Sequence, residues 1–188
     1  RKAKVNRVSD QSNSGLQASP AAVASGLPPV LFLADHFGYP SGVSHGLTTY
    51  FLHILPALVK AGVDLTACFL REPHPAAEQL RDAGIKPIFL STGKLDVLVP
   101  FRIAAIAKER GCRILHASQM KATLAARIAA PLVGARAIGH VHDLKPTGPL
   151  VGGLHWLFSR RSDIGLCVAD AVQDMAVSVR PKIPIGPN

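Results

Sequence analysis

Apolar and polar positions follow two different periods from residue 30 onward. The run Val30–Ala34 is apolar at every position, which is typical of a strand buried on both faces of a sheet. Apolar residues then recur from Leu47 to Leu58 at the i, i+3, i+4, i+7, i+8 and i+11 positions of an amphipathic helix. Gly62 stands where a left-handed C-cap belongs, and Pro56 is expected to kink this helix.

The same alternation predicts further strands and helices along the rest of the chain. The strands are expected at residues 65–70, 85–90, 113–116, 137–142 and 164–168. The helices are expected at residues 75–83, 95–110, 118–133 and 150–161. Ser118 is a suitable N-cap and Gly134 a suitable C-cap for the third of these helices. Strands that alternate with helices predict an α/β fold with a Rossmann-like, doubly wound parallel sheet.

The first 28 residues differ in composition from the rest of the chain. They are rich in Ser, Ala, Gln and Asn and show no apolar period, which predicts a disordered N-terminal arm that ends at Pro28 and Pro29. Residues 29–188 have the length of one α/β domain. No apolar run reaches the ~18 residues that a membrane-spanning helix needs.

Charge and cysteine usage narrow the partners and the compartment. The chain has 21 Lys and Arg against 12 Asp and Glu, a net charge of +9, and four of the cations lie in its first eight residues. The remainder is basic as well, which favours anionic partners such as phosphates, acidic lipid headgroups or nucleic acid. Cys68, Cys112 and Cys167 are far apart and lie in apolar runs, which predicts buried free thiols in a reducing, cytoplasmic compartment.

Polar residues and histidines gather where the predicted strands end. They lie in three segments, residues 35–46, 116–119 and 140–145. Because ligands of open parallel sheets bind beyond the carboxyl ends of the strands, these segments form the candidate site. Gly38, Gly42 and Gly46 do not have the spacing of a dinucleotide fingerprint or a P-loop, although they allow backbone N–H groups to approach an anion. Asp35 and His45 are further candidates in the first segment.

Short motifs in a fixed order resemble a known family. They are Ser41-Gly42-Val43, the helix end around Gly62, the segments 114–122, 139–143 and 167–172, and the last residues, 183–188. This order resembles the N-terminal, acceptor-side domain of a family 4 retaining glycosyltransferase with the GT-B fold. Three places depart from the family pattern: Ser41 replaces the first glycine of a pair, Ala169-Asp170 replaces Ser-Glu, and the last residues are scrambled relative to Pro-Asn-Gly.

The resemblance implies one half of a two-domain enzyme. In that family the C-terminal domain binds the nucleotide sugar and supplies a Glu-x7-Glu motif, which the glutamates of this chain, Glu72, Glu78 and Glu109, do not form. The chain is therefore expected to be the acceptor-binding half of a hexosyltransferase and to be inactive alone. The acceptor would be a glycan, a lipid-linked sugar or a small molecule, and the nucleotide sugar would be a co-substrate, with no cofactor or metal.

The resemblance also assigns roles to residues of the three segments. It places His142 at the reaction centre as the catalytic residue, where a neutral imidazole would orient the acceptor hydroxyl. The expected acceptor-binding residues are Ser41, Gly42, Val43, His45, His116, Lys121, Asp143 and Lys145. Trp156, Arg160 and Arg161 suit a peripheral contact with the inner face of a membrane, as an enzyme with a lipid acceptor would need.

Two other functions fit parts of the sequence. His140, His142 and Asp143, together with His116, have residue types that a metal-dependent hydrolase would use, although the spacing of known metallo-hydrolases is not met. The net charge of +9 by itself would suit a non-catalytic, anion-binding domain. Nucleic acid is not expected as a partner, because aromatic residues make up only 5% of the chain and no recognition motif is present.

Overall fold

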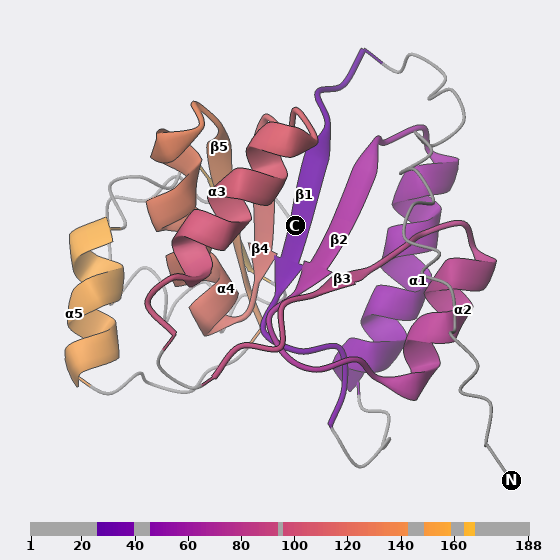
Figure 1. The fold of residues 1–188 in the computed structure, drawn as a ribbon, viewed down its shortest axis with the longest axis horizontal. Helices are drawn as coiled ribbons and strands as arrows, with labels where there is room; N and C mark the ends of the chain where they lie inside the picture. The colour runs from indigo at the N-terminus through magenta and orange to yellow at the C-terminus, as the bar shows by residue number, and fades with distance from the viewer. Residues whose placement is uncertain (1–25, 40–45, 94–95, 143–148, 159–163, 168–188) are drawn as a thin grey trace, which may run out of the picture.

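The computed structural model describes residues 26–39, 46–93, 96–142, 149–158 and 164–167, which form an α/β domain around one parallel sheet (Figure 1). The strands are β1 (Val30–Ala34), β2 (Leu65–Phe69), β3 (Ile88–Phe89), β4 (Ile114–Ser118), β5 (Arg136–Val141) and β6 (Ile164–Cys167). Their order in the sheet is β3-β2-β1-β4-β5-β6, and each neighbouring pair is parallel. The predicted Rossmann-like class and its six strands are confirmed. Most of the predicted N-terminal arm, residues 1–25, lies outside the described residues.

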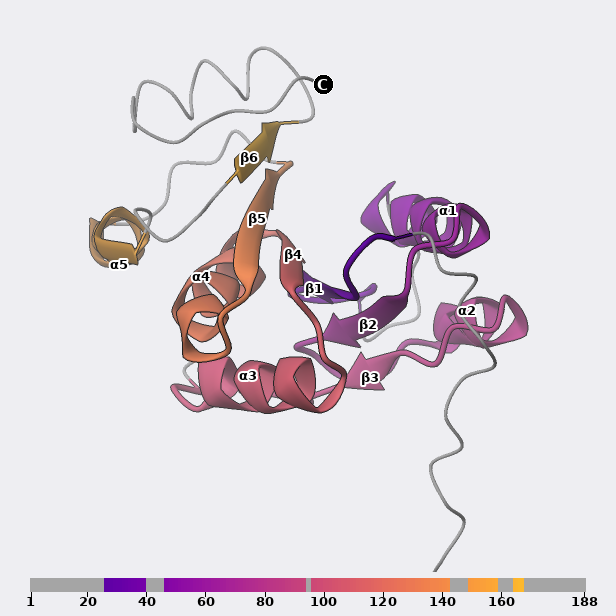
Figure 2. The ribbon, with the colours of Figure 1, turned by 90° about the horizontal axis from the view of Figure 1, so that it is seen from above.

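Helices cover both faces of the sheet. They are α1 (Gly46–Lys60), a 3₁₀ turn (Pro75–Ala77) that leads into α2 (Glu78–Asp82), α3 (Val99–Glu109), α4 (Met120–Ala129) with a 3₁₀ turn (Ala130–Leu132), and α5 (Pro149–Phe158). α1 and α2 pack on one face and α3 and α4 on the other, as Figure 2 shows from above. α5 contacts α4. Across the described ranges, each helix is too short or too polar to span a bilayer.

Two prolines account for differences between the expected and the observed bounds. β3 pairs with β2 only through Ile88 and Phe89, because Pro87 has no N–H with which to extend the strand. α3 begins at Val99, later than the expected residue 95, and this start places Pro100 in the first turn of the helix. A missing N–H has no cost in the first turn, because that group has no partner within the helix.

Glycines end two helical segments as expected. Gly62 has a φ of +85°, and the N–H of Val63 after it donates to the carbonyl of Leu58 at 3.0 Å, which closes α1. Gly134 has a φ of +64° and follows the 3₁₀ turn after α4 in the same way. Pro56 lies inside α1, which runs on through it to Lys60.

Alternate residues of the central strands point to opposite sides and build two different interiors. The interior under α1 and α2, which we call the aromatic face, contains Phe32, Phe37, Phe51 and Phe69. The interior under α3 and α4, which we call the alanine face, contains Leu31, Leu33, Ala122, Ala125, Ala126 and Ala129.

The three cysteines are free and buried, as predicted. Burial raises the pKa of Cys68 to about 12 and that of Cys112 to about 11. Burial also raises the pKa of Cys167 above its ordinary value. These groups are therefore thiols at neutral pH, and the thiolate needed for nucleophilic or redox chemistry is disfavoured.

Candidate functional site

The sheet order creates a topological switch point between β1 and β4. The chain leaves β1 toward α1 on one face and leaves β4 toward α4 on the other. The two strands pair in parallel as far as Ala34 and Ser118, so the segments that follow them meet at the carboxyl edge of the sheet. Doubly wound sheets bind their ligands in the crevice at this place.

Asp35, the first residue after β1, holds the N-terminus of α4. Its carboxylate accepts hydrogen bonds from the backbone N–H groups of Lys121 at 3.2 Å and Ala122 at 2.5 Å. The prediction of Ser118 as the N-cap is wrong, because Ser118 is the last residue of β4 and Gln119 takes the N-cap position without a capping side-chain bond. A carboxylate from another loop therefore satisfies the N–H groups that begin α4.

Gln119, which follows β4, in turn contacts the segment that follows β1. Its side-chain oxygen accepts hydrogen bonds from the backbone N–H groups of Asp35 at 2.9 Å and His36 at 3.3 Å. Its amide nitrogen lies 3.1 Å from Nε2 of His36. Gln119 has a φ of +74°, a left-handed conformation that is uncommon outside glycine and that persists only where the surroundings hold it. We call Asp35, His36 and Gln119 the edge clamp.

Burial shifts the pKa values of Asp35 and His36, the two titratable groups of the edge clamp, in the direction that favours their uncharged forms. It raises the pKa of the Asp35 carboxyl, while the N–H groups of Ala122 and Lys121 act in the opposite direction. Burial lowers the pKa of His36, and the positive charge of Arg71 lowers it further. The imidazole of His36 is therefore neutral at pH 7.

A second polar group lies on β4 and β5, toward the aromatic face. The ring centroid of His140 is 5.6 Å from that of His116 and 4.1 Å from that of His142. Tyr50 of α1 packs on them, with its ring centroid 5.3 Å from that of His142 and its hydroxyl 3.5 Å from Nδ1 of His140. Phe32 adds an aromatic neighbour, 5.2 Å from His116. We call His116, His140 and His142 the imidazole cluster.

Two members of the imidazole cluster are uncharged at neutral pH. Burial lowers the pKa of His116 to about 4, and the neighbouring His142 lowers it as well. Burial also lowers the pKa of His140 to about 4, with further contributions from His142 and His116. Nε2 of His116 is buried and has no hydrogen-bond partner within the part of the chain that the structure describes. Buried polar atoms normally have a partner, so this unsatisfied nitrogen departs from the usual pattern.

The structure brings some of the predicted site residues together. His116 and His142 share the imidazole cluster with His140, although His116 lies in the middle of β4 because the strand continues to Ser118. Lys121 is exposed in the first turn of α4, at the switch point. The other predicted acceptor-binding residues lie outside the described residues: Ser41, Gly42, Val43, His45, Asp143 and Lys145. So do Arg160, Arg161 and the side chain of Trp156.

The described residues do not support a metal centre. Among them, no group of three or more His, Cys, Asp or Glu side chains is arranged to hold a metal ion. The ring of His140 contacts the rings of His116 and His142. Asp143, the acid of the metal-dependent alternative, lies outside the described residues.

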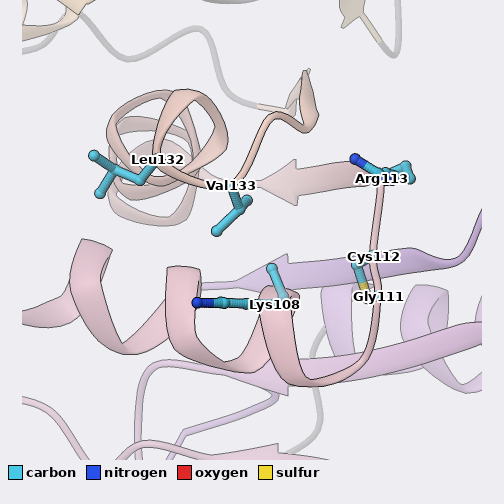
Figure 3. Close-up of a pocket in the computed structure, with 7 residues that line it drawn as sticks. Lys108, Gly111, Cys112, Arg113, Leu132 and Val133 are labelled. Carbon is cyan, nitrogen blue, oxygen red and sulfur yellow. The ribbon is translucent and has the colours of Figure 1, made fainter.

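A cavity of about 380 Å³ lies at the opposite, amino edge of the sheet (Figure 3). It is formed between the end of α3 and the turn that follows α4, with Lys108, Arg113, Leu132 and Val133 in its wall. No residue of the edge clamp or of the imidazole cluster lines it. The cavity is therefore separate from the candidate site.

Sequence reasoning missed Gln119 and Tyr50 as site residues. The apolar period assigns Tyr50 to the buried stripe of its helix, and the structure shows that its hydroxyl reaches His140. No local signal predicts the position of Gln119, because its partners Asp35 and His36 lie 84 and 83 residues earlier.

Comparison with protein families gives a match over most of the chain. The model of the family described as Glycosyltransferase Family 4 matches residues 44–188. No curated protein matches the chain in sequence.

Solved structures match the fold at low sequence identity. HepE of Anabaena in complex with UDP and glucose has a TM-score of 0.66 at 15% identity, over 86% of this chain and 45% of that one. A glycosyltransferase from Rickettsia africae has a TM-score of 0.65 at 14% identity, over 84% and 42%. The lipopolysaccharide outer core galactosyltransferase WaaB, in its apo form, has a TM-score of 0.63 at 13% identity, over 85% and 44%. The chain thus spans less than half the length of these proteins, and its Rossmann-like domain corresponds to one half of a GT-B architecture.

Proposed function

Because the chain belongs to glycosyltransferase family 4, we propose that it is the acceptor-binding half of an enzyme that transfers a sugar from a nucleotide-sugar donor to an acceptor hydroxyl. The chain spans less than half the length of its structural relatives, which supports a second domain for the donor. HepE binds UDP and glucose, which supports a nucleotide sugar as the co-substrate of this enzyme as well. The transfer then needs no further cofactor.

The imidazole cluster is the observation that carries this proposal. His142 directly follows β5, at the edge of the sheet where ligands of this fold bind. His116 and His140 beside it are neutral at pH 7, because burial lowers the pKa of both. A neutral imidazole nitrogen accepts a hydrogen bond from a hydroxyl group without adding charge to the site.

In the transfer, a bond forms between the acceptor oxygen and the donor sugar while the bond between that sugar and the phosphate breaks. The acceptor hydroxyl loses its proton, and the departing phosphate takes it up. Before the transfer, His142 accepts a hydrogen bond from the acceptor hydroxyl and so holds its oxygen next to the sugar carbon, on the face from which the phosphate leaves. Orientation of this kind can supply a large part of the rate enhancement. Tyr50 keeps the cluster in place through its contacts with His140 and His142.

The acceptor is a glycan, a lipid-linked sugar or a small molecule. Lys121 is exposed at the N-terminus of α4 and suits a phosphate group on such an acceptor. The remaining acceptor-binding residues are proposed from the sequence: Ser41, Gly42, Val43, His45, Asp143 and Lys145. A lipid-linked acceptor would place the enzyme at the inner face of the membrane, in contact with Trp156, Arg160 and Arg161.

The test uses the full-length gene product that contains this chain. It is incubated with UDP-, GDP- and ADP-sugars and a panel of glycan, lipid-linked and small-molecule acceptors, and the glycosylated product is measured. We expect transfer from at least one donor. We expect His142→Ala to lower kcat about 100-fold, at the lower end of the range for a positioned catalytic side chain. His53→Ala is the matched control, because His53 is an exposed histidine of α1 outside the site.

The outcomes separate the reaction from the role of His142. His142→Gln is expected to keep more activity than His142→Ala, because an amide oxygen still accepts a hydrogen bond from the acceptor hydroxyl. An absence of transfer from every nucleotide sugar in the panel contradicts the proposed reaction. Transfer that His142→Ala leaves unchanged contradicts the role of His142 alone.

A further inference from the structure

Tyr39 presents an exposed aromatic ring at the carboxyl edge of the sheet, just beyond the edge clamp. The residue is 56% exposed. Its ring stacks on that of His36, with 5.6 Å between the centroids and 26° between the planes. The imidazole of His36 therefore supports the phenol ring of Tyr39 from one side.

The segment that carries Tyr39 is held in place by its neighbours. Phe37 is fully buried in the aromatic face, and its carbonyl accepts a hydrogen bond from the hydroxyl of Thr48 at 2.9 Å. Gly38 lies against the ring of His74, where a Cβ atom would come within 2.5 Å of the imidazole. A side chain that is positioned in advance loses little conformational freedom when a ligand binds.

The hydrogen bonds of Gln119 determine which nitrogen of His36 carries the proton. Its amide oxygen accepts from the backbone N–H groups of Asp35 and His36, so its NH₂ group faces Nε2 of His36 at 3.1 Å. An amide NH₂ group can only donate, and Nε2 must therefore accept. A neutral imidazole whose Nε2 accepts has its proton on Nδ1.

We propose that Tyr39 is a platform on which a sugar ring of the acceptor stacks, and that Gln119 is a positioning residue that holds the supporting His36 as a neutral imidazole with its proton on Nδ1. The proposal rests on the proposed sugar transfer and names one part of its acceptor site. It assigns ligand contact to Tyr39 and an indirect role to Gln119.

The chemistry of a pyranose fits this surface. One face of a pyranose ring consists of C–H groups, which are attracted to the electron-rich face of an aromatic ring, and its rim consists of hydroxyls. The phenol hydroxyl of Tyr39 is able to bond to that rim. The platform also lies at the switch point, where the fold binds its ligands. A charged His36 would instead attract the electrons of the Tyr39 ring, so a neutral support keeps the platform available to C–H groups.

A binding experiment tests the platform without requiring transfer. Saturation-transfer NMR is recorded on the full-length protein with the methyl glycosides of glucose, galactose, mannose and N-acetylglucosamine, and with glycerol as a negative control. We expect saturation of aromatic protons to reach the ring protons of at least one glycoside. Tyr39→Ala should abolish this transfer, and Tyr39→Phe should keep it. Phe101→Ala is the matched control, because Phe101 is an exposed ring on α3, 59% exposed.

No transfer to any of the four glycosides, or transfer that survives in Tyr39→Ala, overturns the platform even where the enzyme is active. In the complete reaction we expect Tyr39→Ala to raise the acceptor KM about tenfold, equivalent to about 1.4 kcal/mol, with a smaller change in kcat. A rise in the donor KM instead would assign the ring to the nucleotide and overturn a sugar platform for the acceptor. A protein that transfers no sugar but contacts a glycoside through Tyr39 contradicts the proposed function and supports the platform.

The role of Gln119 is tested on the ring nitrogens of His36 by ¹⁵N NMR. In the unmodified protein we expect a protonated Nδ1 and an unprotonated Nε2. Gln119→Glu keeps the acceptor oxygen for the two backbone N–H groups but removes the donor to Nε2. The proton should then move to Nε2, and the pKa of His36 should rise by about one unit or more next to a carboxylate. The positive φ at position 119 is equally unfavourable for Gln and for Glu, so the unmodified protein and Gln119→Glu have the same backbone strain there.

A kinetic measurement links this change to the acceptor. In Gln119→Glu the acceptor KM should rise as the pH falls through the new pKa of His36, whereas it should stay level in the unmodified protein. A proton on Nε2 in the unmodified protein, or a His36 spectrum that Gln119→Glu leaves unchanged, overturns the positioning role. The urea midpoints of both proteins are compared, so that a loss of folding is recognised as such.

Discussion

The two faces of the sheet use the same strands and have opposite characters. Where β1 turns Leu31 and Leu33 toward α3 and α4, the interior is aliphatic, and α4 contributes alanines to it. Where the alternate residues turn toward α1 and α2, the interior is built from rings, with Phe32 5.6 Å from Phe51 and 5.2 Å from His116 between centroids. The period of two in a strand thus separates an aliphatic interior from an aromatic interior that also carries the candidate chemistry.

Ring packing explains why the histidines belong to the aromatic face. The rings of Phe32 and His116 meet at 59°, in a tilted arrangement with 5.2 Å between the centroids, within the range over which aromatic rings interact. The alanine face has its own buried polar pair, in which a guanidinium nitrogen of Arg127 donates to Nδ1 of His155 at 2.9 Å. That bond joins α4 to α5, so it connects two helices. On the aromatic face, His140 and His142 instead lie at the end of β5, with His116 beside His140 in the middle of β4.

The largest expected effect comes from removing volume on the aromatic face. Phe51 is fully buried and contacts Phe32, Phe37 and Phe69 through its ring. We expect Phe51→Ala to lower the free energy of unfolding by about 3–5 kcal/mol. On the alanine face, adding volume with Ala126→Leu should cost about 1–3 kcal/mol, because buried alanines let α4 approach the sheet closely. Urea denaturation measures both.

Ala57→Leu is the control for these two variants. Ala57 is exposed on α1, so the larger side chain should change the free energy of unfolding by less than about 0.5 kcal/mol. A cost of Phe51→Ala that does not exceed that of Ala126→Leu would contradict the difference between the faces.

A smaller effect is expected from pH, and on the aromatic face it comes from His116. His116 titrates near 6.5 in the unfolded chain, but burial lowers its pKa in the fold to about 4. Between these values the unfolded chain binds more protons, so stability falls as the pH falls. Between pH 7 and pH 5 this residue should remove about 2 kcal/mol. Over the same pH range, we expect the free energy of unfolding of His116→Gln to fall by about 2 kcal/mol less than that of the unmodified protein.

The measurement is a series of urea denaturations from pH 7 to pH 4.5 on both proteins. The slope against pH is compared, because His116→Gln also changes stability at every pH. Parallel curves for the two proteins would mean that His116 titrates normally in the fold. The neutral state assigned to His116 would then be wrong.

The class of fold could be predicted from the sequence because its signals are local. A buried parallel strand such as Val30–Ala34 is apolar throughout, and the helix after it has an apolar stripe, so both are visible without their neighbours. The bounds were predicted less well where a single proline decides them, as at Pro87 and Pro100.

The candidate site could be predicted only in part, because much of it depends on contacts between distant segments. The pair His140 and His142 was visible, since residues two apart in a strand share a side. The N-cap of α4 was predicted wrongly. Ser118 is a residue type that often caps helices and lies just before α4, but it is the last residue of β4. Asp35 accepts a hydrogen bond from the N–H of Lys121, and Gln119 accepts one from the N–H of Asp35. The sequence around neither residue predicts these bonds.

The smallest effect is expected at the cap that joins the two faces at their edge. Asp35→Ala removes the acceptor for the N–H groups of Lys121 and Ala122 and should lower the free energy of unfolding by about 1 kcal/mol. Asp35→Asn should cost less, because an amide oxygen still accepts a hydrogen bond. Burial also raises the pKa of the Asp35 carboxyl, which means that desolvation of the charge already offsets part of what the charge contributes.

Urea denaturation at pH 7 and amide hydrogen exchange in the first turn of α4 measure this effect. Asp82→Ala is the control, because Asp82 is an exposed carboxylate at the end of α2 and caps no helix start. Faster exchange limited to α4 in Asp35→Ala would show that the cap stabilises one helix locally. Equal losses in Asp35→Ala and Asp35→Asn would show that α4 depends on the negative charge of Asp35 and its interaction with the helix dipole, and not on the acceptor oxygen alone.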